Sequence, residues 1–503
     1  MARYLLGTDN GGTVSKAGLF TIDGREIAVV GRKTEMVSPQ PGHTERDPEG
    51  LWRTTAEAIR SVIEQSGIDP KDIEAVACAG HGNGLYLVDE QGKPVRPGIY
   101  STDSRAKDII ARWTREGVDK KILPKTMQCI WPAQPNALLA WLCDHEPDVM
   151  KRARWVLMCK DYIRLCLTGE VHAEMTDFSG TSLMNVGTGR YDPDILEAFG
   201  IAEVGHLLPP LVRSEAICGK VTARAAAETG LAEGTPVAGG LFDIDACGLA
   251  SAITDPSQMC MIAGTWGNNQ YLWKEPVVSE DVFMTSRYCI PGYYLILEGS
   301  ATSASNLEWF VTQFFRSDGD AAPQGESIYD RCNQWVAATK PDEAKIVFLP
   351  FLFGSNADVD AKASLIGLSG WHHRGHALRA IYEGVVFGHK RHVDKLLKFR
   401  DPPESIHLTG GVARSEVWVQ IFADVFGVPV EIPAGTELGA LGAAICAGVA
   451  AGCHGSYEEA CRAMVQIARV QQPDLARGDL YAAKFEHHRK VVAALGPVWK
   501  DLS

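Results

Sequence analysis

The first part of the chain alternates short hydrophobic runs with polar turns, a pattern typical of strands in a buried sheet. Three runs have the length of strands and follow one another closely: residues 4–9, 15–20 and 26–30. The turn between the first two contains Gly11 and Gly12, and the Asp23-Gly24 pair between the last two favours a tight hairpin. The pattern therefore predicts an antiparallel meander, not the strand–helix–strand start of a dinucleotide fold.

Helical periodicity follows this meander. Residues 51–65 carry hydrophobic positions at the spacing of an amphipathic helix, and residues 73–79 form another apolar run of strand length. Because strands and helices alternate along the chain, the fold class is expected to be mixed α/β.

A similar strand–turn–strand pattern recurs in the second half. Residues 259–263 and 269–273 predict two strands, and the turn between them contains Gly264 and Thr265. Two such turns in one chain indicate either a duplicated architecture that grips a phosphate between its halves, or two unrelated hairpins.

A third region combines strands with helices that are rich in small or apolar residues. Residues 406–409 predict a strand, which the tight turn Gly410-Gly411 connects to a helix over residues 415–426. Residues 428–432 predict the next strand. Residues 435–452 are dense in alanine and glycine and predict a helix that lets another backbone approach closely.

The length of the chain indicates more than one domain. It has 503 residues, whereas a single hydrophobic core stops growing at about 250–300 residues. A glycine- and alanine-rich segment ends near residues 253–256, just before the second hairpin pattern. The expected domains are therefore residues 1–253 and 254–503.

Composition excludes several classes of protein. Hydrophobic residues make up 46% and charged residues 22%, which excludes a disordered chain. The net charge of −13 gives no basic footprint for nucleic acid. No apolar run reaches the roughly 18 residues needed to span a membrane. With no secretory signal and 13 cysteines that form no C-x-x-C pair, we expect a cytoplasmic protein with reduced cysteines and no zinc site.

Common nucleotide-binding motifs are absent. The chain contains no G-x-x-x-x-G-K-[ST] sequence, and the glycines of residues 80–84 lack the spacing of a dinucleotide fingerprint. A P-loop enzyme and a nicotinamide-dependent enzyme are therefore not expected.

The turn after the first strand offers a different anion site. Backbone N–H groups of Gly11, Gly12 and Thr13 can converge on an anion. Asp9 at the end of the strand can hold Mg²⁺ through water, because Mg²⁺ takes few carboxylates and keeps several waters. Lys16 is near enough in sequence to reach a phosphate. A plain hairpin with a capping aspartate accounts for the same residues.

Two further centres carry acidic residues. A strand runs into Asp243, and a small-residue helix leaves it, so Asp243 or Asp245 is either a helix cap or an exposed catalytic carboxylate. Asp103 and Arg105, two residues apart on an extended segment, can bind adjacent hydroxyls of a polyol or form a surface ion pair of little energetic value.

Four segments, taken in order, resemble the FGGY family of carbohydrate kinases. They are LLGTDNGGTVSKAGLF (residues 5–20), GGLFD (239–243), SLIGLSGWHHRGHALRAIYEG (364–384) and LTGGVARSEVWVQIFAD (408–424). The resemblance covers nearly the whole chain. It implies two ribonuclease-H-like (actin-like ATPase) domains with a cleft between them, and ATP-dependent phosphorylation of a small sugar. The likeness of further whole segments, such as SPQPGHTERD (38–47) and NLEWF (306–310), implies a ketopentose such as L-xylulose.

The resemblance also implies a role for each candidate residue. Asp243 would be the general base, and Asp9 would organise Mg²⁺. The residues that would grip the phosphates of ATP are Gly11, Gly12, Thr13, Lys16, Gly264 and Thr265. The residues that would line the nucleotide site are Gly410, Gly411 and Ser415. The residues that would face the sugar, together with Asp243, are His81, Asn83, Asp103 and Arg105.

Several alternatives stay open from the sequence. The sugar can be another ketose or polyol, such as xylulose, ribulose, erythritol or glycerol, because one or two hydroxyl contacts decide among them. A non-catalytic sugar-binding regulator on the same fold is a further alternative. A heat-shock ATPase would need a peptide-binding domain after the ATPase, for which no chain remains. A small-molecule sugar is the expected partner, and a homodimer is a further expectation.

Overall fold

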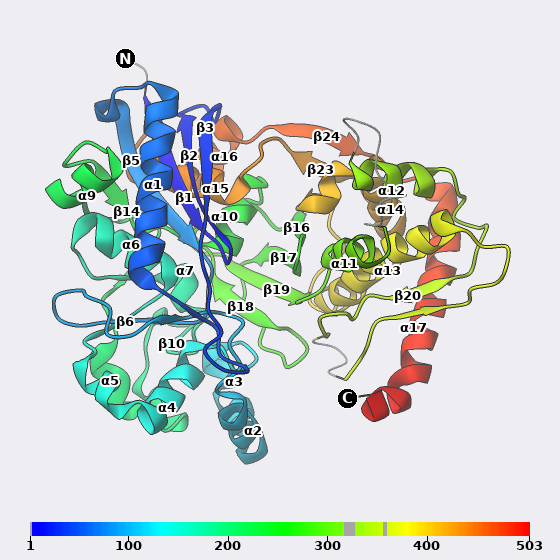
Figure 1. The fold of residues 1–503 in the computed structure, drawn as a ribbon, viewed down its shortest axis with the longest axis horizontal. Helices are drawn as coiled ribbons and strands as arrows, with labels where there is room; N and C mark the ends of the chain where they lie inside the picture. Colours follow the sequence, from blue (N-terminus) through cyan, green and yellow to red (C-terminus); the bar gives the residue numbers. More distant parts are fainter. Residues whose placement is uncertain (1–2, 316–326, 356–359, 503) are drawn as a thin grey trace. The chain divides into compact units, whose positions relative to one another are not determined.

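A computed structural model describes residues 3–315, 327–355 and 360–502 (Figure 1). The chain divides into two compact units. The first comprises Met1–Thr254, Leu272–Ile296 and Ala434–Gln466, and the second comprises Asp255–Tyr271, Leu297–Pro433 and Ile467–Ser503. The expected boundary between residues 253 and 254 lies one residue from the point where the chain first leaves the first unit, after Thr254. It does not describe the two later segments that return to the first unit. The segment Ala434–Gln466, near the end of the chain, belongs to the first unit.

The expected strands and helices are present, with ends that differ by no more than three residues. The strands of the first sheet are β1 (Tyr4–Asn10), β2 (Val14–Thr21), β3 (Glu26–Lys33), β5 (Ile73–Gly80), β13 (Ile217–Lys220), β14 (Pro236–Ala238) and β15 (Leu241–Phe242). Short strand pairs accompany it: β4 (Glu45–Arg46) with β7 (Gly98–Ile99), β6 (Tyr86–Val88) with β8 (Trp155–Leu157), β9 (Ala173–Glu174) with β12 (Leu211–Val212), and β10 (Met184–Asn185) with β11 (Arg190–Tyr191).

The described part of the first unit also contains twelve α-helices. They are α1 (Pro48–Ser66), α2 (Lys107–Glu116), α3 (Val118–Thr126), α4 (Pro135–His145), α5 (Pro147–Arg152), α6 (Cys159–Thr168), α7 (Met175–Phe178), α8 (Pro193–Ala198), α9 (Ala223–Thr229), α10 (Asp243–Ala250), α15 (Leu438–Ala450) and α16 (Tyr457–Met464).

The first sheet has the order β13-β14-β5-β1-β2-β3, and β15 also pairs with β5. β1, β2 and β3 form the expected antiparallel meander. β5 runs parallel to β1, β14 and β15. The carboxyl ends of β1, β5 and β15 therefore meet at one edge of the sheet.

Helices cover both faces of this sheet (Figure 1). Leu6 of β1 packs with residues of α1, α6 and α9 in one hydrophobic core. The next residue, Gly7, faces the other side, because successive strand residues alternate. A Cβ on Gly7 would lie 2.7 Å from the backbone nitrogen of Ala444, and a Cβ on Gly442 would lie 2.5 Å from the carbonyl carbon of Ala246 in α10. The small residues of α15 thus allow the close backbone approach that the sequence indicated.

The second sheet has the order β18-β19-β17-β16-β22-β23-β24. Its strands are β16 (Gln258–Ala263), β17 (Gly267–Trp273), β18 (Met284–Arg287), β19 (Tyr294–Ser300), β22 (Ser405–Thr409), β23 (Val430–Pro433) and β24 (Ile467–Gln471). Of these strands, β18 falls within the segment Leu272–Ile296 of the first unit. The second unit also contains the pair β20 (Val347–Leu349) and β21 (Ser364–Ile366), and the helices α11 (Ser305–Phe314), α12 (Ile328–Ala337), α13 (Arg374–Leu396), α14 (Glu416–Phe426) and α17 (Gly478–Trp499).

The two hairpins hold equivalent positions in their sheets. β1 pairs antiparallel with β2 on one side and parallel with β5 on the other. β16 pairs antiparallel with β17 and parallel with β22 in the same way. This shared topology favours a duplicated architecture over two unrelated hairpins.

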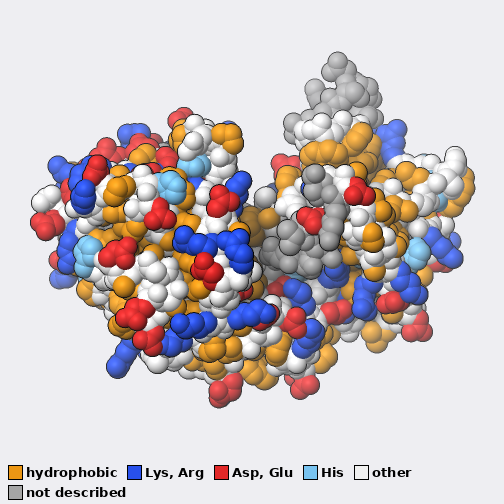
Figure 2. Space-filling model, turned by 90° about the horizontal axis from the view of Figure 1, so that it is seen from below, with side chains coloured by type: hydrophobic (Ala, Val, Ile, Leu, Met, Phe, Trp, Pro, Cys, Tyr) orange, Lys and Arg blue, Asp and Glu red, His pale blue; other side chains and the backbone are white. Residues whose placement is uncertain are grey.

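The surface carries charged side chains of both signs (Figure 2). Acidic and basic side chains are interspersed on the face drawn in Figure 2. Within the described ranges, none of the helices combines the length and the hydropathy that a membrane crossing requires.

Candidate active site

Asp9 and Asp243 lie at the same edge of the first sheet. Ala79 of β5 is the register partner of Asp9 on one side and of Leu241 on the other. Since β1 and β15 are both parallel to β5, the three strands end at a common edge. Asp9 is the penultimate residue of β1, and His81 and Asp243 directly follow β5 and β15, so all three lie at neighbouring strand ends.

The carboxyls at this edge share a negatively charged environment. Burial is the main cause that raises the pKa of Asp243 well above its usual range, and the charges of Asp9 and Asp177 raise it further. Burial also raises the pKa of Asp9, although the charge of Lys16 opposes this effect. A carboxylate with a higher pKa is a stronger base than an ordinary aspartate.

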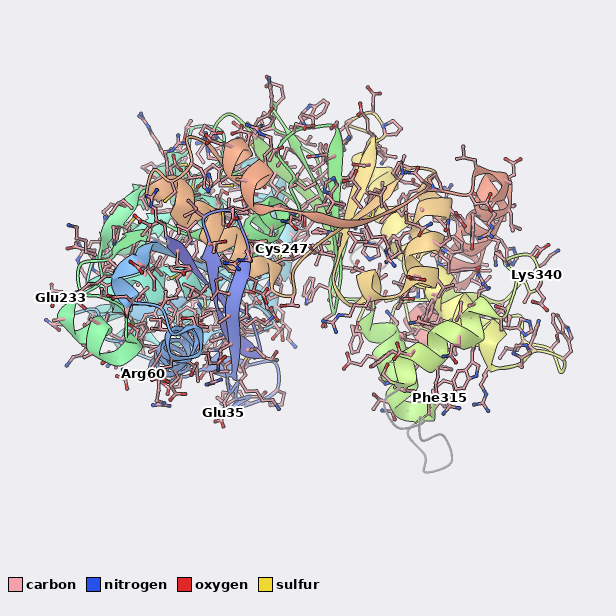
Figure 3. All side chains as sticks on the ribbon, turned by 90° about the horizontal axis from the view of Figure 1, so that it is seen from above. Glu35, Arg60, Glu233, Cys247, Phe315 and Lys340 are labelled. Atoms are coloured by element: carbon pink, nitrogen blue, oxygen red, sulfur yellow. The ribbon has the colours of Figure 1, made fainter. Side chains whose placement is uncertain are left out.

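The helix-cap alternative for the acidic pair of α10 is wrong. α10 begins at Asp243, and the capping residue Phe242 accepts no hydrogen bond through its side chain. Asp245 is fully buried instead, and burial raises its pKa well above the usual range. Cys247, labelled in Figure 3, lies one turn beyond Asp243 on the same helix face.

The first turn of α15 approaches Asp9 closely. A Cβ on Gly439 would lie 2.6 Å from Cγ of Asp9, so only glycine leaves room for the carboxylate in its present place. Lys16 does not point freely toward a phosphate. Its Nζ lies 2.5 Å from Glu437 at the start of α15. Burial lowers the pKa of Lys16, but the hydrogen bond with Glu437 and the charge of Asp9 outweigh it and raise the pKa overall.

A residue that the sequence analysis did not single out, Arg46, forms hydrogen bonds with the glycine turn. Arg46 is 1% exposed, and its Nη2 donates to the carbonyl oxygens of Gly11 and Gly12. The N–H of Gly11 donates to Val14 at 3.2 Å, so this amide already closes the turn. A Cβ on Gly12 would lie 3.0 Å from Cζ of Tyr100, which explains why glycine stands there.

His81 and Asn83 follow β5 and differ in how their polar atoms are used. Burial is the main cause that lowers the pKa of His81 to about 3, and the charge of Arg46 adds to it, so the imidazole is neutral. Nε2 of His81 lies 3.3 Å from the hydroxyl of Tyr86. Asn83 has a left-handed backbone (φ 58°), and its buried Oδ1 has no hydrogen-bond partner. That oxygen is available to a ligand hydroxyl.

Asp103 and Arg105 form a buried pair, so the surface ion pair considered above is wrong. Nε and Nη2 of Arg105 donate to the two oxygens of Asp103 at 2.9 and 2.8 Å. Nη2 also donates to Glu45 at 2.8 Å, and the N–H of Thr44 donates to Asp103 at 2.7 Å. The two oxygens of Asp103 are thus used within the protein, whereas the buried Nη1 of Arg105 has no partner.

A magnesium ion fits the carboxyl of Asp9. Mg²⁺ prefers oxygen ligands and is usually held by one or two carboxylates together with waters and substrate phosphates. A divalent cation also relieves the repulsion through which Asp9 raises the pKa of Asp243. No group of three or more His, Cys, Asp or Glu side chains in the described residues can hold a metal alone.

The second unit contains a pocket of about 500 Å³ at the ends of β16 and β22. Four residues expected at the phosphates or the nucleotide line it: Gly264, Thr265, Gly411 and Ser415. The volume lies within the range of about 300–1,000 Å³ that is usual for small-molecule sites.

The wall of this pocket includes three residues that the sequence reasoning missed. Asn333 of α12 accepts hydrogen bonds from the hydroxyls of Ser415 and Tyr382 at 2.6 and 2.8 Å. The rings of Tyr382 and Trp418 stack with centroids 4.1 Å apart. Ser415 also caps α14 by accepting the N–H of Trp418. Tyr382 and Trp418 lie inside the segments that carry the family resemblance, but no local pattern pointed to Asn333.

Gly410 supports the pocket instead of lining it. Its backbone has φ +91°, and a Cβ there would lie 2.6 Å from the carbonyl carbon of Ala263. Glycine is therefore required where the turns after β22 and β16 meet. On the other turn, the carbonyl of Gly264 accepts the N–H of Ala304 at 2.9 Å, and that of Thr265 accepts the hydroxyl of Ser305 at 3.1 Å.

Comparison with known proteins places this architecture among the sugar kinases. The model of the N-terminal domain of the FGGY family of carbohydrate kinases matches residues 4–249, and the model of its C-terminal domain matches residues 259–451. The chain is 38% identical over 496 residues to the L-xylulose/3-keto-L-gulonate kinase of Escherichia coli (strain K12), covering 98% of each protein. It is 36% identical to a probable L-xylulose kinase of Pasteurella multocida (strain Pm70), covering 98% of this chain and 99% of the relative.

A solved structure agrees with the fold. The chain superimposes on the crystal structure of xylulose kinase from Rhodospirillum rubrum with a TM-score of 0.88 and 27% identity, covering 99% of this chain and 100% of that one. This similarity confirms the α/β fold with two sheet-containing domains.

Proposed function

This chain belongs to the FGGY family of carbohydrate kinases and is a sugar kinase, and on that premise we propose that it phosphorylates a ketopentose, L-xylulose, with Asp243 as the general base. The observation that carries the proposal is the meeting of Asp9, His81 and Asp243 at one edge of the first sheet. In the proposed reaction the attacking hydroxyl of the sugar gives its proton to the carboxylate of Asp243, and its oxygen bonds to the γ-phosphorus of ATP. The bond from that phosphorus to the bridging oxygen breaks, and ADP leaves.

Asp243 suits the task of accepting a proton. A sugar hydroxyl is a very weak acid, so the proton moves late, when the oxygen has begun to bond to phosphorus. The raised pKa of Asp243 brings the proton affinity of the carboxylate closer to that of the transferring hydroxyl. General base catalysis typically contributes about 10²–10⁴-fold.

Asp9 and the two turns would bind the phosphates. We propose that Asp9 holds Mg²⁺, which when bound neutralises charge that develops on the transferring phosphoryl group. Thr13 and Gly12 on the first turn, and Gly264 and Thr265 on the second, would contact phosphate oxygens. Gly11 contributes by closing its turn, because its N–H is already bonded.

The nucleotide would occupy the pocket of the second unit. Gly411 and Ser415 line it together with the Asn333 side chain. The ring of Tyr329, which is 40% exposed, also lines this pocket. Lys16 can contribute to phosphate binding only by exchanging its ion pair with Glu437.

For the sugar, we propose contacts from His81, Asn83 and Arg105. Asn83 Oδ1 and Arg105 Nη1 are both buried and unpartnered, so a bound polyol would satisfy one acceptor and one donor. The Asp103 carboxylate orients Arg105 and accepts no hydroxyl itself, because the protein already occupies its oxygens. The names of the relatives from Escherichia coli and Pasteurella multocida support L-xylulose over other ketoses.

A panel of sugars tests this proposal. ADP release would be measured with ATP and Mg²⁺ for L-xylulose, 3-keto-L-gulonate, D-xylulose, ribulose, erythritol and glycerol. We expect the highest kcat/KM with L-xylulose. A higher kcat/KM with another member would assign the site to that sugar, and no ADP release above background with any member would contradict the proposal.

A further inference from the structure

A buried network of charged side chains is connected, through Thr176, to the segment that carries Asp243. Nζ of Lys160 lies 3.1 Å from Asp161, 3.4 Å from Glu174 and 3.1 Å from Asp177, and none of these side chains is more than 1% exposed. Burial lowers the pKa of Lys160, but the three carboxylates outweigh it and raise the pKa overall, so the ammonium stays charged. The network is too deeply buried to contact a substrate, and nothing in the proposed reaction uses it directly.

Glu174 connects this network to the hydroxyl group of Thr176. Its Oε2, which faces Lys160, accepts the hydroxyl proton of Thr176 at 2.7 Å. Its Oε1 accepts the N–H of Thr176 at 2.9 Å and the hydroxyl of Ser214 at 2.8 Å. Because the single hydroxyl proton of Thr176 points to Glu174, the lone pairs of that oxygen are left to accept.

The acceptor side of Thr176 faces the residue before Asp243. The N–H of Phe242 donates to Oγ1 of Thr176 at 3.0 Å. The side chain of Phe242 is held as well, since a Cβ on Gly82 would lie 2.5 Å from Cζ of its ring. The side chain of Phe242 does not cap α10. The position of Asp243, the first residue of this helix, therefore depends on the backbone of Phe242.

We propose that Thr176 is a positioning residue for Asp243, which it holds through the N–H of Phe242 while Glu174 and Lys160 fix the direction of its hydroxyl. This inference rests on the proposed role of Asp243 as the base. Thr176 is 2% exposed and touches no substrate atom in this account. Its loss should therefore lower the rate of the chemical step more than it weakens substrate binding.

Substitutions at Thr176 separate the hydroxyl from the rest of the side chain. Thr176→Val has nearly the same shape but leaves the N–H of Phe242 without an acceptor, whereas Thr176→Ser keeps the hydroxyl. We expect the valine variant to lower kcat about 10- to 100-fold, the cost of a misplacement near 1 Å, and to leave the KM for sugar within about threefold. The serine variant should recover kcat to within about threefold of the unmodified protein.

Thr229 provides a matched control in the same unit. It is also a fully buried threonine whose hydroxyl donates to one backbone carbonyl, of Ala225 at 2.6 Å, and accepts one backbone N–H, of Leu231 at 3.2 Å. Thr229→Val should leave kcat and KM unchanged. Thermal denaturation of all variants would show which are folded. Thr176→Ala, which places no methyl group against Glu174, gives the same test if the valine variant does not fold.

The outcomes distinguish this inference from the proposed function. A folded Thr176→Val or Thr176→Ala protein with unchanged kcat would overturn the positioning role, as would a serine variant as slow as the valine variant. An equal loss in Thr229→Val would overturn it too, because the effect would then belong to any buried threonine. Asp243→Asn is assayed in parallel. If it turns over normally, the proposed base is wrong; if it is slow while Thr176→Val is normal, only the positioning role fails.

Discussion

Gly439→Ala should lower activity by about 10²-fold without unfolding the protein. The added Cβ would lie 2.6 Å from Cγ of Asp9, whereas non-bonded carbon atoms pack best at about 3.5–4.0 Å. The difference, 3.5 − 2.6, is about 1 Å, and the Asp9 side chain can supply it by rotating away from α15. Since alanine has a higher helix propensity than glycine by up to about 1 kcal/mol, the helix itself should not suffer.

A displacement of about 1 Å in a group that positions the reacting atoms costs on the order of 10²-fold in rate. We therefore expect kcat/KM, measured by ADP release with L-xylulose, to fall by about that factor while the thermal midpoint changes little. Gly478→Ala, at the start of α17, is the control, because an added Cβ there meets nothing within 4 Å. If Gly439→Ala is folded and as active as Gly478→Ala, the place of the Asp9 carboxylate does not matter for catalysis.

Three further variants test other parts of the account. Ser415→Ala removes the cap of α14 and a hydrogen bond to Asn333; KM for ATP should rise while KM for sugar does not, and the reverse result would contradict the nucleotide site. Asn83→Gly keeps the left-handed backbone but loses the free oxygen. One lost hydrogen bond of about 1.4 kcal/mol should raise KM for sugar about 10-fold, and an unchanged KM would remove Asn83 from the sugar site. Burial lowers the pKa of His488 from 6.5 to about 3, so unfolding takes up a proton below about pH 6.5 and stability falls as the pH falls. Urea denaturation of His488→Phe should show this loss reduced by about 1.4 kcal/mol per pH unit between about pH 5.5 and 4, and an unchanged slope would contradict the buried neutral imidazole.

The acidic centre could be predicted from the sequence because its position is local. Asp9 ends a strongly apolar strand, and Asp243 stands between a strand and a small-residue helix, so both side chains had to emerge at strand ends. The small residues of α15 indicated close packing for the same reason, and Gly7 and Gly442 show where it occurs.

Contacts between distant segments could not be read from local patterns. Arg46 reaches the turn of Gly11 from 35 residues away, and Asn333 bonds Ser415 across 82 residues. Arg46 lies inside the segment SPQPGHTERD, which carries part of the family likeness, but nothing in that segment or around Asn333 reveals these partners. Asp103 and Arg105 fitted a surface pair equally well, because nothing nearby in sequence reveals that Glu45 and the ring of Trp141 enclose them. The return of Ala434–Gln466 to the first unit is likewise a long-range property.

The central claim is that Asp243 accepts the proton of the attacking sugar hydroxyl. The most direct test compares Asp243→Asn with the unmodified protein, using calorimetry for L-xylulose binding and ADP release for turnover. The account predicts that sugar binding persists while kcat falls by about 10²–10⁴-fold, the usual contribution of a general base. An asparagine variant that turns over L-xylulose at nearly the unmodified rate would contradict it.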